Sequence, residues 1–157
     1  MKMRCVGLVV VGDVITVVDA QVPNDIGEPI TILSDTTWNL QQGDRGPALA
    51  VLHQRCADYL RENEIALVVV KASALPTGSV KLSLLGSAEA RGVIIAAAAS
   101  VSEVAILSKA VISRTYGDRK VDEYLKDDGF WDDHTEGGRM RKTSREAAML
   151  ILAARNR

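Results

Sequence analysis

The side chains that could do metal or nucleophilic chemistry are spread thinly along this chain of 157 residues. The spacing of the two cysteines and two histidines matches no recognised metal-ligand pattern. These residues are Cys5, His53, Cys56 and His134. Both cysteines lie in apolar stretches, which is typical of reduced core residues in a cytoplasmic protein. We therefore expect no metal site built from these four residues.

Two other catalytic arrangements also lack support. Ser73, Ser79 and Ser83 have no histidine near them in the sequence, so a hydrolase triad is not indicated. The glycines between residues 7 and 46 do not have the spacing of a phosphate-binding loop.

Charge is balanced overall but unevenly distributed. The formal net charge of -1 gives no global attraction to nucleic acid or to an anionic membrane. Residues 118–137 hold eight acids against three bases, whereas residues 138–157 hold six bases against one acid. This pattern favours two solvated faces that partly neutralise each other. Beside DNA, the acidic segment 118–136 would repel the phosphates, or it would occupy the groove and exclude them.

Length and hydropathy predict one α/β domain over residues 1–157. The chain is 47% hydrophobic but only 4% aromatic, so Val, Leu, Ile and Ala must fill the core. The N-terminus lacks the pattern of a secretory signal. The longest apolar stretch, near residues 92–99, is too short to span a bilayer, so no membrane partner is expected.

Hydrophobic periodicity gives the order of the expected elements. Strands are expected at 5–11, 14–20, 30–34, 65–70 and 104–107. Helices are expected at 47–63, 80–99, 121–128 and 144–156, with a helical turn at 109–113 and a loop at 132–138. The order predicts a five-stranded mixed sheet, in which a three-strand antiparallel meander precedes βα units and helices flank the sheet. This is the ribonuclease-H-like order, since a doubly wound nucleotide-binding fold would open with βαβ.

Two stretches carry a resemblance to a known family. Residues 81–99 read KLSLLGSAEARGVIIAAAA, and residues 102–117 read SEVAILSKAVISRTYG. They resemble the long second helix and the fifth strand of RuvC-type Holliday-junction resolvases, which belong to the ribonuclease-H-like superfamily. The resemblance implies a two-metal nuclease site whose carboxylates come from the first strand, the end of the fourth strand and the start of the last helix.

Carried onto this chain, those four family positions fall on Val9, Lys71, Thr143 and Glu146. One carboxylate remains, and an ammonium group stands where a metal ligand is implied. We therefore expect a degenerate site with no catalytic residues, no metal and no cofactor. We predict that Lys71 and Glu146 form an ion pair; the alternative is that each side chain points separately into solvent.

Nucleic-acid contacts remain open under the resemblance. The family's aromatic wedge after the fourth strand is replaced by Ala74, so stacking on an unpaired base is not expected. Basic residues that could contact phosphates are Lys71, Lys81, Arg91, Lys109, Arg114, Arg139, Arg141 and Lys142. In the family the second helix packs at a dimer interface, which makes a homodimer the expected assembly. The corresponding interface candidates are Leu82, Leu85, Gly86, Glu89 and Ala90.

The first functional hypothesis is a non-catalytic RuvC-like protein that serves as a nucleic-acid-binding or assembly module, with branched or single-stranded DNA as a weak partner. The second is a divergent magnesium-dependent endonuclease on the same DNA classes, using acids such as Asp35, Glu146 or the Asp132–Asp133 pair. It requires three or more carboxylates at one strand end. A third hypothesis is an interaction protein whose partner is another protein.

Overall fold

The computed structural model describes residues 2–115, 117 and 119–156. The elements in chain order are β1 (Lys2–Val11), β2 (Val14–Pro23), β3 (Ile30–Asn39), α1 (Arg45–Glu62), β4 (Leu67–Lys71), α2 (Leu82–Ala99), β5 (Glu103–Leu107), α3 (Lys109–Thr115), α4 (Val121–Leu125), α5 (Asp128–His134), β6 (Thr135–Gly137), the short 3₁₀ helix η1 (Lys142–Ser144) and α6 (Arg145–Arg155).

The strands form one mixed sheet in the order β5-β4-β1-β2-β3-β6. The pairs β1–β2 and β2–β3 are antiparallel, which confirms the expected meander. The pairs β1–β4 and β4–β5 are parallel, as βα units require. The predicted mixed α/β sheet with a leading meander is confirmed, although within the described residues it has six strands in place of five.

Two differences from the expected elements have causes that the structure shows. The expectation of a loop over 132–138 is wrong, because Thr135–Gly137 pairs with the edge of β3 as β6. Gly137 there has φ +90, a conformation that favours glycine. The expected helix over 121–128 is also interrupted, because Asp127 accepts a hydrogen bond from the Phe130 backbone N–H and begins a new helix, α5.

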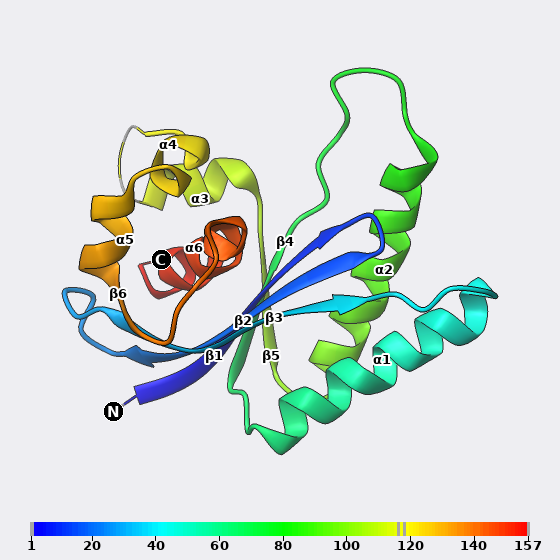
Figure 1. Ribbon diagram of the computed structural model, residues 1–157, viewed down its shortest axis with the longest axis horizontal. Helices are drawn as coiled ribbons and strands as arrows, with labels where there is room; N and C mark the ends of the chain where they lie inside the picture. The colour runs from blue at the N-terminus through cyan, green and yellow to red at the C-terminus, as the bar shows by residue number, and fades with distance from the viewer. Residues whose placement is uncertain (1, 116, 118, 157) are drawn as a thin grey trace.

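The helices cover the sheet on two sides (Figure 1). On one side α1 and α2 pack against Val6, Leu8 and Val68. On the other side α6 packs against Cys5, Val9 and Val69, and α3, α4 and α5 surround it. Because the sheet and these three helices surround α6, its seven consecutive residues 147–153 are buried. Both faces of the central strands are therefore covered, as their continuous apolar sequence predicts.

A glycine brings α6 into close contact with β1. A Cβ atom built on Gly7 would lie 2.1 Å from the carbonyl oxygen of Ala147. No side chain fits there, so the first turn of α6 lies directly on the middle of β1. This contact fixes where Glu146, one residue before Ala147, meets the sheet.

Helix α2 is covered on one face only. Ser87, Ala90, Ile94 and Ala97 point into the domain and are buried. Although residues 92–99 are too few for a bilayer, the whole of α2 is long and apolar enough to cross one by length and composition alone. A core helix of a soluble protein passes the same test.

Candidate functional site

The carboxyl ends of β1 and β4 place two of the family positions side by side. The parallel register pairs Leu8 with Val70, so Val9 and Lys71 are neighbours on adjacent strands. Adjacent strands lie about 4.8 Å apart. Val9 is buried, while 26% of the Lys71 side-chain surface is exposed to solvent. A valine and an ammonium group therefore occupy this strand edge.

Lys71 contacts Glu146, the acid among the four positions mapped from the resemblance. Its Nζ donates to Oε1 of Glu146 at 3.0 Å, and both side chains are about three-quarters buried, with 26% and 22% exposure. Glu146 lies in the first turn of α6, where a carboxylate is favoured by the N–H groups of the helix. The predicted Lys71–Glu146 ion pair is confirmed.

Thr143, the remaining mapped position, takes no part in this pair. Thr143 lies in η1 just before α6 and is exposed. Of the four positions, then, one is apolar, one is a neutral hydroxyl and two neutralise each other. This set does not fit a two-metal centre, which needs several carboxylate oxygens converging on the ions.

Asp35 on β3 is satisfied by other partners. Its carboxylate accepts hydrogen bonds from the Arg141 side chain at 2.8 and 3.1 Å, from the Arg141 backbone N–H at 2.8 Å and from Ser144 Oγ at 2.6 Å. Burial alone would raise the pKa of Asp35, but the hydrogen bonds from Arg141 and Ser144 outweigh it and lower the pKa. Asp35 is thus an ionised carboxylate whose oxygens are already occupied.

The alternative nuclease hypothesis required several acids to converge. Within residues 2–115, 117 and 119–156, no group of three or more His, Cys, Asp or Glu residues is placed to hold a metal ion. Glu146 is paired with Lys71, Asp35 is paired with Arg141, and Asp132 and Asp133 are exposed on α5. The structure does not bring these acids together.

Half of the candidate phosphate-binding residues already have acidic partners. Besides Lys71, these are Lys109 with Asp122 at 3.7 Å, Arg141 with Asp35 at 2.8 Å and Lys142 with Asp128 at 3.8 Å. Across the part of the chain that the structure describes, Lys81, Arg114 and Arg139 are exposed and have no ion pair. Ala74 is exposed in the loop between β4 and α2.

Arg91 is an exception among these candidates, because it is buried. Its guanidinium donates to the carbonyl oxygen of Val10 at 3.0 Å and to Ser73 Oγ at 2.7 Å. Desolvation by burial lowers its pKa. The interpretation of Arg91 as a surface contact for phosphates is wrong, since this side chain joins α2 to the ends of β1 and β4 inside the domain.

The expected interface residues on α2 divide into two groups. Leu82 and Leu85 are exposed, as an interface requires of the free chain. Ala90 is fully buried beside Ile94 and Ala97, so its assignment to an interface is wrong. Because α2 is apolar on nearly every side, its sequence alone did not reveal which face turns toward the sheet.

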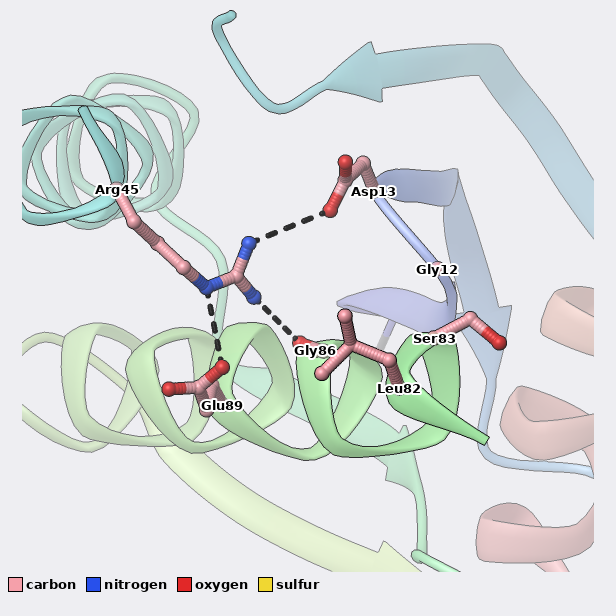
Figure 2. Close-up of a pocket in the computed structure, with 7 residues that line it drawn as sticks. All are labelled: Gly12, Asp13, Arg45, Leu82, Ser83, Gly86 and Glu89. Carbon is pink, nitrogen blue, oxygen red and sulfur yellow. Dashed lines mark hydrogen bonds and ion pairs between the residues drawn. The ribbon is translucent and has the colours of Figure 1, made fainter. Parts of the chain in front are cut away.

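Gly86 and Glu89 contribute to a pocket of about 370 Å³ that Leu82 also lines (Figure 2). Arg45, at the start of α1, reaches across it. Its Nε donates to Glu89 at 3.0 Å, one Nη donates to the Gly86 carbonyl oxygen at 2.9 Å, and the other lies 3.6 Å from Asp13. Arg45 therefore joins α1, α2 and the β1–β2 turn, and it neutralises Glu89.

The Arg45 contacts could not be found by sequence reasoning. Arg45 lies 41 residues before Gly86 and outside every periodic pattern, and the helix was expected to begin only at residue 47. The buried residues Ser87, Ala90, Ile94 and Ala97 recur at helical spacing, but the exposed small and apolar residues of α2 do so as well, so the spacing does not identify the buried face.

Comparison with known proteins places the fold. No family model and no curated protein sequence matches the chain. Among solved structures, RuvC of Thermus thermophilus has a TM-score of 0.75 and 13% identity, covering 96% of this chain and 92% of that one. RuvC of T. thermophilus in complex with a Holliday junction has a TM-score of 0.69 and 12% identity, covering 96% and 91%. The yeast mitochondrial Holliday junction resolvase Ydc2 has a TM-score of 0.61 and 13% identity, covering 98% and 77%. The chain therefore has the ribonuclease-H-like fold of the RuvC-type Holliday-junction resolvases.

Proposed function

We propose that this chain is a non-catalytic RuvC-like protein that forms a homodimer through α2 and binds branched or single-stranded DNA weakly. The observation that supports the loss of cutting is the Lys71–Glu146 ion pair at 3.0 Å. The ammonium group takes the place of a metal ligand and neutralises the one acid that remains. The Lys71 ammonium group repels a divalent cation. Exchanging Lys71 for a metal ion would therefore stabilise the Glu146 carboxylate little.

The uncovered face of α2 supports dimerisation. Along it lie the exposed residues Leu82, Leu85, Ala88, Glu89, Gly92, Ala96 and Ala99. The single charged side chain in this row, Glu89, is already paired with Arg45. An apolar face with small residues permits close approach of another helix, and a second copy presents the same face by two-fold symmetry.

A membrane is a poorer partner for this face. One side of α2 forms part of the domain core, and the polar Ser87 and Arg91 lie on that side. Withdrawing α2 into lipid would break the domain open. We also propose that the protein is cytoplasmic, because its two cysteines, Cys5 and Cys56, are buried free thiols.

The unpaired basic residues support weak DNA binding. Lys81 lies just before α2, which follows β4, and Arg114 lies in α3, which follows β5. Arg139 lies a few residues before η1. Phosphate contacts of this kind release counterions, so binding falls steeply with salt. The T. thermophilus RuvC structure with a Holliday junction makes a four-way junction the first DNA to try.

Two measurements test this function. Purified protein is mixed with a labelled four-way junction at about 50 to 200 mM salt, where three phosphate contacts predict a slope of log K against log salt near about -3. Lys81→Glu with Arg114→Glu is expected to weaken binding at least about tenfold, whereas the control, Lys2→Glu with Arg61→Glu, changes it by less than about twofold. Equal effects of the two variants, or no binding at all, would remove the DNA-binding part of the proposal.

The second measurement addresses cutting. With magnesium or manganese, branched, single-stranded and duplex substrates are expected to remain intact. Cutting by the wild type that disappears in Glu146→Ala would overturn the non-catalytic proposal and favour the divergent nuclease. If junction binding is absent but the dimer forms, a protein partner becomes the better interpretation.

A further inference from the structure

The acidic segment, defined here as residues 119–136, lies next to basic residues that were candidates for binding phosphates. It includes α4 and α5 and carries seven acids against three bases. Figure 1 shows it on the α6 side of the sheet, with α4 beside α3. Two of its carboxylates, those of Asp122 and Asp128, lie close to bases on neighbouring elements, although both side chains are more than 60% exposed.

Three ion pairs link the segment to those elements. Asp122 Oδ2 on α4 lies 3.7 Å from Lys109 Nζ at the start of α3. Asp128 Oδ1 on α5 lies 3.8 Å from Lys142 Nζ in η1 and 2.8 Å from an Nη of Arg145 in α6. The carboxylates of α4 and α5 thus neutralise bases from three separate elements.

The segment is fixed in place by buried contacts. Tyr124 and Trp131 are each 2% exposed, and Trp131 Nε1 donates to the Tyr124 carbonyl oxygen at 2.9 Å. Arg145 donates to the carbonyl oxygen of Leu125 at 3.0 Å. Because these anchors belong to the core, the acids keep their position beside Lys109 and Lys142.

We propose that the acidic segment acts as an internal competitor for DNA: Asp122 and Asp128 occupy Lys109 and Lys142 as phosphates would. This inference rests on the proposed DNA binding and names how that binding is regulated. A base that is already neutralised by a carboxylate releases no counterion when a phosphate arrives, so it adds little to affinity. The two lysine pairs are exposed and longer than 3.5 Å, so they attenuate binding and do not abolish it.

The test compares two variants that remove the same amount of charge from the same segment. Asp122→Asn with Asp128→Asn removes the carboxylates that contact the bases. Asp132→Asn with Asp133→Asn removes two exposed carboxylates for which the structure shows no ion pair within the described residues. Binding of a labelled four-way junction is measured by fluorescence anisotropy between about 50 and 200 mM salt.

The first variant is expected to bind about tenfold more tightly than the wild type at low salt, with a salt slope steeper by about two, because two lysines become available to phosphates. The second is expected to stay within about twofold of the wild type. Equal gains in the two variants would overturn the inference, since diffuse charge would then explain the effect.

Other outcomes separate this inference from the proposed function. If the wild type binds through Lys81 and Arg114 but the first variant gains nothing, competition is wrong and DNA binding stands. If only the first variant binds, competition stands and DNA binding by the wild type is wrong. If neither binds, both are wrong. Asp122→Asn alone, which leaves the Arg145 contact intact, is expected to gain about threefold with a slope steeper by about one, and it controls for misfolding.

Discussion

The two helical sides of the sheet differ in how they treat charge and apolar surface. On the α6 side, where the resolvase family places its metals, Lys71 pairs with Glu146 and Asp35 pairs with Arg141. On the α2 side, Leu82 and Leu85 stay exposed, and the nearby Glu89 is already paired with Arg45. The charged groups on the α6 side therefore pair with one another. On the α2 side, by contrast, an apolar helix face remains exposed. This contrast is the basis on which we propose assembly, and not cutting, as the role of the scaffold.

The largest expected effect comes from the contact that closes the α6 side. Gly7→Ala would place a Cβ 2.1 Å from a backbone oxygen of α6, where neither partner is a flexible side chain. We expect a loss of about 3 kcal/mol or more in the free energy of unfolding, measured by urea denaturation. Gly46→Ala, which meets no atom within 4 Å, is the control and should not destabilise. Equal stabilities of the two variants would contradict the close packing of α6 on β1.

The next effect concerns the open side. Leu82→Glu with Leu85→Glu puts two charges on the α2 face, and we expect the dimer to dissociate at least about a hundredfold more readily, which corresponds to about 2.7 kcal/mol. Sedimentation equilibrium of the full chain measures this shift. The control is Ile26→Glu, an exposed residue in the turn between β2 and β3. If the wild type were monomeric at every concentration, the proposed dimer would be wrong.

A smaller effect is expected from breaking the Lys71–Glu146 pair. Lys71→Met leaves the carboxylate of Glu146 partly buried without its partner, and we expect a loss of about 1 to 2 kcal/mol in the free energy of unfolding, reduced from a fully buried pair by the residual exposure. The double variant Lys71→Met with Glu146→Leu should recover most of that loss. A double-mutant cycle in urea tests it, and additive effects would mean that the pair is not coupled.

The smallest effect depends on pH. The folded-state pKa of Asp35 is lowered, so its stabilising contribution is complete above the unfolded value near about 3.9 and is lost as pH falls through the folded value. The wild type should exceed Asp35→Asn by about 1 kcal/mol at about pH 6, and the difference should shrink below about pH 4. Thermal unfolding across this range measures it. If the stability difference between the wild type and Asp35→Asn grew on acidification, the ionised Asp35 carboxylate would not be its cause.

The sequence was informative where a pattern was local or where a family position could be carried over. The meander, the β4 strand and the Lys71–Glu146 pair followed from apolar runs and from the mapped positions. The strand β6 and the reach of Arg45 depend on partners more than forty residues away, so no local pattern contained them. Ala90 and Arg91 were misplaced because α2 has apolar residues on nearly all sides, which hides the direction of the core.

The measurement that bears most directly on the central claim is a manganese titration followed by electron paramagnetic resonance. The wild type is expected to leave the signal of free Mn²⁺ unchanged at equimolar protein. Val9→Asp with Lys71→Glu, which places two carboxylates beside Glu146 on neighbouring strand ends, is expected to remove about one equivalent of free ion. Stoichiometric Mn²⁺ binding by the wild type that disappears in Glu146→Gln would contradict the claim that the ion pair has replaced the metal site.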